Sequence, residues 1–132
     1  MANEFIFVYG TLRKGVNSFM SHLLVSHAEY LCEGSIQARL YEVDGYPGAV
    51  QSEDPYDTVI GEVYKTGQAA TLFQNLDEYE ECTINFQTPH EYTRKKITVK
   101  LADSTTVSAS TYLFNHDVST LHRIRSGDYL KR

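Results

Sequence analysis

The stretch Phe5-Ile6-Phe7-Val8-Tyr9-Gly10-Thr11-Leu12 decides the expected fold of this 132-residue chain. Residues 5–9 are continuously apolar or aromatic, and a short run of this kind predicts a strand that is buried on both faces in the middle of a sheet. The glycine that follows opens a turn over residues 10–15. Crevices at strand ends often bind ligands, and the successive amides of such a turn can bind an anion. The residues alone favour a plain connecting turn, and a ligand-binding turn is the alternative.

The remaining pattern predicts one domain, residues 1–132, with a mixed α+β fold. Strands are expected at 35–43, 58–65, 96–101 and 106–114, the last two forming a hairpin around residues 102–104. Helices are expected at 18–26 and at 67–80, with Thr66 as the N-cap of the second. Residues 44–48 read as a tight turn, 81–92 as an irregular loop, and 115–132 as short turns or helix. Mostly strands with one or two short helices between them indicate a mixed sheet or a partly closed barrel.

Glu80 is the most informative single residue of the predicted helix. At about 100° per residue, the apolar side chains gather in one stripe about 120° wide, formed by Ala69, Leu72, Phe73, Leu76 and Tyr79. Glu80 falls inside this stripe, whereas Glu78 and Glu81 face solvent. A carboxylate on an apolar face needs a partner, a proton or a cavity, and desolvation raises its pKa toward the range of a general base. The alternative is that the helix ends earlier and Glu80 turns to water.

Charge and cysteine content exclude several functional classes. The chain has 12 basic and 17 acidic residues, a net charge of −5, so nucleic acid is not expected as a partner. No apolar run reaches the roughly 20 residues of a membrane-spanning helix, so no membrane association is expected. Cys32 and Cys82 lack metal-ligand spacing, and we expect two free thiols, no metal site and a cytoplasmic location.

Motifs spread in order over nearly the whole chain resemble the γ-glutamyl cyclotransferase-like superfamily. Each motif is short, but their order makes the combination specific. They are the opening strand with Tyr9-Gly10-Thr11-Leu12, Gly45-Tyr46-Pro47, Gly61-Glu62-Val63-Tyr64, Leu76-Asp77-Glu78-Tyr79-Glu80, Tyr92 with Arg94, and Ser126-Gly127-Asp128-Tyr129. The form of the first motif and the short length are similar to the γ-glutamylamine cyclotransferase and uncharacterised bacterial branch.

The resemblance implies a barrel-like fold and an enzyme that converts a γ-glutamyl amine or amide to 5-oxoproline and a free amine, without a cofactor. It places the catalytic glutamate at Glu80, the residue that the helical periodicity singles out. The substrate-binding residues that it implies are Tyr9, Gly10, Thr11, Leu12, Tyr46 and Tyr92. The expected partner is a small γ-glutamyl substrate, and the expected assembly is a monomer or a weak homodimer.

Two other functions fit the same residues. A non-catalytic module would bind a small amino-acid-like ligand in the same crevice and release no product. In an interaction protein, Glu80 would only complete a buried hydrogen-bond network. The carboxylate on an apolar stripe favours the enzyme.

Overall fold

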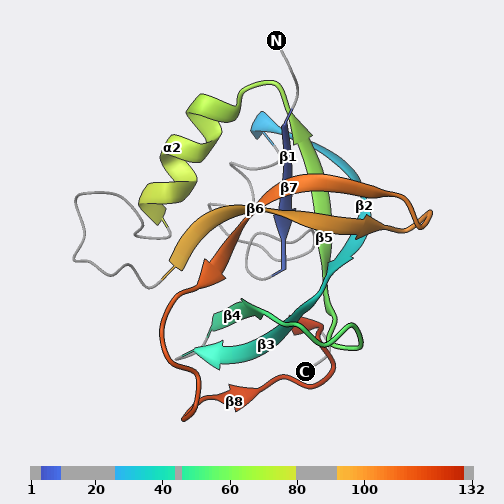
Figure 1. Ribbon diagram of the computed structural model, residues 1–132. Helices are drawn as coiled ribbons and strands as arrows, with labels where there is room; N and C mark the ends of the chain where they lie inside the picture. The colour runs from blue at the N-terminus through green and yellow to red at the C-terminus, as the bar shows by residue number, and fades with distance from the viewer. Residues whose placement is uncertain (1–3, 10–25, 44–45, 80–91, 130–132) are drawn as a thin grey trace.

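The computed structural model describes residues 4–9, 26–43, 46–79 and 92–129. In this part of the chain, five strands form a closed barrel in the order β1-β5-β2-β6-β7, and three form a small sheet in the order β4-β3-β8 (Figure 1). The elements are β1 (Glu4–Val8), β2 (Glu29–Ile36), β3 (Ala38–Val43), β4 (Tyr46–Gln51), β5 (Val59–Thr66), α2 (Ala69–Tyr79), β6 (Tyr92–Leu101), β7 (Thr106–Phe114) and β8 (His122–Arg123). The mixed, barrel-like architecture expected from the sequence is confirmed.

The first strand has a partner strand on each side in the barrel, as its apolar run predicts. β1 pairs antiparallel with β5, where Phe7 lies opposite Val63, and parallel with β7, where Ile6 lies opposite Ser110. Ile6, Phe7 and Val8 are all buried. A strand with neighbours on both sides and cover on both faces has no solvent-exposed face to make polar, so its sequence does not alternate.

Gly61 on β5 permits the close approach of β1. A Cβ atom at this position would lie 2.3 Å from the Val8 carbonyl oxygen and 2.6 Å from the Phe7 ring. Real side chains never come so close to backbone, so only glycine fits where the two strands meet. This contact explains why β5 carries a glycine at this position.

Gly127, in the motif near the C-terminus, has a backbone conformation that favours glycine. Its φ angle is +68°, in the left-handed region that favours glycine. A Cβ atom there would lie 1.9 Å from the Thr58 carbonyl oxygen. The Gly127 carbonyl accepts a hydrogen bond of 2.7 Å from the Ile60 amide. The segment after β8 is therefore tied to the start of β5.

Two apolar clusters divide the core, and alternate residues of β1 point into them. Phe7 and Tyr9 belong to the cluster inside the barrel, which continues into the small sheet through Leu40 and Ala49. Ile6 and Val8 belong to the cluster outside the wall, which α2 covers. Figure 1 shows α2 lying across the outside of the barrel, with the small sheet at one end. Side chains thus fill the inside of the barrel, and α2 packs on its outer face.

Several element boundaries differ from the sequence-based expectation. Residues 35–43 were expected to form one strand, but Gln37 separates β2 from β3, which lie in different sheets. The predicted turn at 44–48 is shorter, because Tyr46 already pairs with Val43 at the start of β4. Pro47 is tolerated there because β4 is an edge strand of its sheet. The expected loop at 81–92 ends where β6 begins at Tyr92, and the tail contains the short strand β8. The expected helix at 18–26 lies largely outside the described residues.

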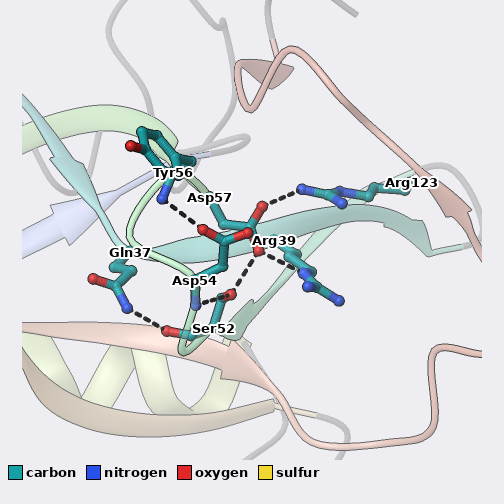
Figure 2. A network of polar contacts seen from close by, with 7 residues as sticks. All are labelled: Gln37, Arg39, Ser52, Asp54, Tyr56, Asp57 and Arg123. Carbon is teal, nitrogen blue, oxygen red and sulfur yellow. Dashed lines mark hydrogen bonds and ion pairs between the residues drawn. The ribbon is translucent and has the colours of Figure 1, made fainter.

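The carboxylate of Asp57 joins the small sheet to the loop before β5. Its two oxygens accept hydrogen bonds from Arg39 Nε on β3 at 2.6 Å, from Arg123 Nη2 on β8 at 2.7 Å and from the Ser52 hydroxyl at 2.6 Å. Figure 2 shows Asp57 between the two arginines. The Ser52 hydroxyl and the two guanidinium groups hold the pKa of Asp57 well below its usual range.

Asp57→Asn is expected to reduce stability at neutral pH, and the loss is expected to shrink in acid. Because the folded pKa is depressed, the stabilisation is complete above the unfolded pKa of about 3.9 and disappears as the pH falls through the folded pKa. Urea unfolding of wild type and variant at pH 7, 5 and 3 measures this. The control is Glu53→Gln, since Glu53 is exposed. An Asp57→Asn deficit that is constant with pH would contradict the ionic account.

Thr111 on the barrel strand β7 is fully buried, and its hydroxyl has no hydrogen-bond partner among the described residues. Thr66 at the end of β5 is the opposite case. Its hydroxyl donates to the His27 carbonyl at 2.6 Å and accepts from the Gln68 amide at 2.9 Å, immediately before α2. The expectation that Thr66 is the N-cap of this helix is wrong, because α2 begins at Ala69 and the Gln68 carbonyl accepts the first helical hydrogen bond, from the Leu72 amide. Thr66 instead fixes the turn that leads into the helix.

Thr111→Val is expected to leave stability unchanged or to raise it by about 1 kcal/mol, because an unpaired buried hydroxyl costs about 1–3 kcal/mol. The matched Thr66→Val should destabilise, since it removes two hydrogen bonds. Thermal unfolding resolves the difference, because about 1 kcal/mol moves Tm by roughly 3–6 °C at this size. Equal losses in the two variants would mean that Thr111 has a partner.

Candidate functional site

Helix α2 places its apolar stripe as the periodicity predicts. Leu72, Phe73 and Leu76 are buried against the outer wall of the barrel, and Ala69 packs beside them. The guanidinium carbon of Arg94 on β6 lies 4.3 Å from the centre of the Phe73 ring, a cation–π contact that joins helix and strand. The helix continues to Tyr79, the residue before Glu80. Glu80 itself lies outside the described residues, so its predicted role stays a prediction.

Tyr9, at the end of β1, is the one member of the predicted substrate-binding turn that the structure describes. Gly10, Thr11 and Leu12 lie outside the described residues. Tyr9 is buried, its hydroxyl donates to the Tyr112 carbonyl on β7, and it accepts from the Ala49 amide on β4 at 3.1 Å. The side chain therefore ties the barrel to the small sheet.

Tyr92, like Tyr9, contacts the backbone of β4. It begins β6, is buried, and donates its hydroxyl to the Pro47 carbonyl on β4 at 2.7 Å. Its ring packs edge-on against Phe114, with 5.6 Å between the ring centres. Tyr46 is the first residue of β4, and its side chain lies outside the description. The structure thus brings the hydroxyls of Tyr9 and Tyr92 to β4, two residues apart, which the sequence motifs did not indicate.

A buried acid on β5, Glu62, was not singled out by the sequence analysis. Only 7% of its surface is exposed, and it lies opposite Val8, the last residue of β1. Tyr64, two residues further along the strand, donates its hydroxyl to Glu62 Oε1 at 3.3 Å. The available signal was an acidic residue inside a strand that is otherwise apolar, aromatic or glycine from Val59 to Tyr64.

In residues 4–9, 26–43, 46–79 and 92–129, no three His, Cys, Asp or Glu side chains are placed to hold a metal ion. No helix within these ranges has the length and apolar content needed to cross a bilayer. Cys32 on β2 is a half-buried free thiol, and Cys82 lies outside the description.

The closed mixed barrel, with a helix across its outer wall and a small sheet at one end, defines the architectural class of the γ-glutamyl cyclotransferase-like proteins. The particular family follows from the sequence. Residues 6–131 match the model of the family described as "Gamma-glutamyl cyclotransferase, AIG2-like". The chain belongs to this family, and the resemblance of the ordered motifs is confirmed.

Solved structures agree with this assignment. YtfP from Escherichia coli is 32% identical, with 97% of both chains covered and a TM-score of 0.63. YkqA from Bacillus subtilis is 25% identical with a TM-score of 0.72; the match covers 98% of this chain, which spans only 40% of YkqA. An AIG2-like protein from mouse shares the fold, with 21% identity, coverage of 95% and 88%, and a TM-score of 0.72. No curated protein matches the sequence.

Tyr9→Phe and Tyr92→Phe are expected to destabilise to different degrees. Tyr92→Phe removes the hydrogen bond to the Pro47 carbonyl, worth about 0.5–1.5 kcal/mol. Tyr9→Phe removes the hydrogen bonds to the Tyr112 carbonyl and from the Ala49 amide, and loss of the partner of a buried amide costs about 1–3 kcal/mol. Urea unfolding measures both, with Tyr56→Phe as the control, because Tyr56 is 92% exposed. A larger loss for Tyr92→Phe than for Tyr9→Phe would contradict this ranking.

Proposed function

We propose that this protein is a γ-glutamyl cyclotransferase-type enzyme that converts a γ-glutamyl amine or amide to 5-oxoproline and a free amine. Membership of the family over residues 6–131 is the observation that carries this proposal. The position of α2 supports it, because the helix buries Leu72 and Leu76 and extends to the residue before Glu80. Continued for one residue, the same helical spacing directs Glu80 toward the apolar side.

In the proposed reaction the substrate supplies its own nucleophile, the α-amine of the γ-glutamyl group. This amine is mostly protonated at neutral pH and cannot attack. Glu80 accepts its proton, and the nitrogen then attacks the γ-carbonyl carbon to close a five-membered ring. As the carbon–nitrogen bond to the leaving amine breaks, Glu80 returns the proton to that nitrogen. The ring nitrogen also loses a second proton, which the released amine takes up as it leaves in its ammonium form. One carboxylate acts first as base and then as acid, a contribution of about 10²–10⁴ in rate.

The turn after β1 has a binding role in this proposal. The amides of Gly10, Thr11 and Leu12 would hold the α-carboxylate of the substrate and so fix the amine against the carbonyl. Positioning of this kind can lower a barrier by about 7–11 kcal/mol. The hydroxyl protons of Tyr9 and Tyr92 are directed to backbone carbonyls, so we propose that these tyrosines offer their rings to the substrate. Tyr46 would complete the pocket beside them.

Glu80→Gln is expected to lower the rate of 5-oxoproline release by about 10²–10⁴ while the fold is kept, because glutamine cannot accept or return the proton. The substrates are a panel of γ-glutamyl amines, γ-glutamyl dipeptides and glutathione, and 5-oxoproline is measured by chromatography. Glu78→Gln is the matched control, since it removes the same charge from a neighbouring position that the helical periodicity predicts on the solvent side.

Three outcomes are informative. Release that is lost in Glu80→Gln and kept in Glu78→Gln supports the mechanism and identifies the substrate class. Release that persists in Glu80→Gln removes this residue from the mechanism. A folded wild-type protein that binds γ-glutamyl compounds saturably without releasing product is the non-catalytic binding module instead.

A further inference from the structure

We draw no further inference here: the strongest candidate, the exposed apolar pair Tyr30 and Leu31 on the part of β2 that extends past its ladder with β6, carries nothing because nothing in the described part of the structure shows what covers it.

Discussion

The pairing of β1 with β5 on one side and β7 on the other is the constraint on which the rest of this structure depends. It closes the barrel, and it requires Gly61 at the point where Phe7 and the Val8 carbonyl approach β5. The two faces of β1 then supply both apolar clusters, one inside the barrel and one beneath α2. Because β1 is held so completely, the place where the chain leaves it is fixed, and the proposed substrate turn begins there.

Elements with strong local signals could be predicted from the sequence. The apolar run of β1, the β-branched and aromatic content of β5 and the hairpin of β6 and β7 each identify a strand without reference to the rest of the chain. The stripe of Leu72, Phe73 and Leu76 identifies α2 for the same reason, since its period is set by the helix itself. Family membership could also be inferred, because the ordered motifs span nearly the whole chain.

Features that depend on distant partners could not be predicted. β4 begins with Tyr46, Pro47 and Gly48, which have turn composition, and it is a strand only because β3 pairs with it. The hydroxyls of Tyr9 and Tyr92 contact the backbone of β4, and no local pattern contains that information. The roles of Glu80 and of Gly10 to Leu12 remain predictions, since these residues lie outside the described ranges.

The closure of the barrel has a consequence for biosynthesis. The Tyr9 hydroxyl bonds to a residue 103 positions later in the chain, so the first strand finds its last neighbour only after nearly the whole protein has been made. At a translation rate of about 5–20 residues per second, β1 has no β7 to pair with for several seconds. An apolar strand with an unpaired edge is prone to associate with other chains during such a delay. The same strand that organises the finished barrel is thus open to association with other chains until β7 has been made.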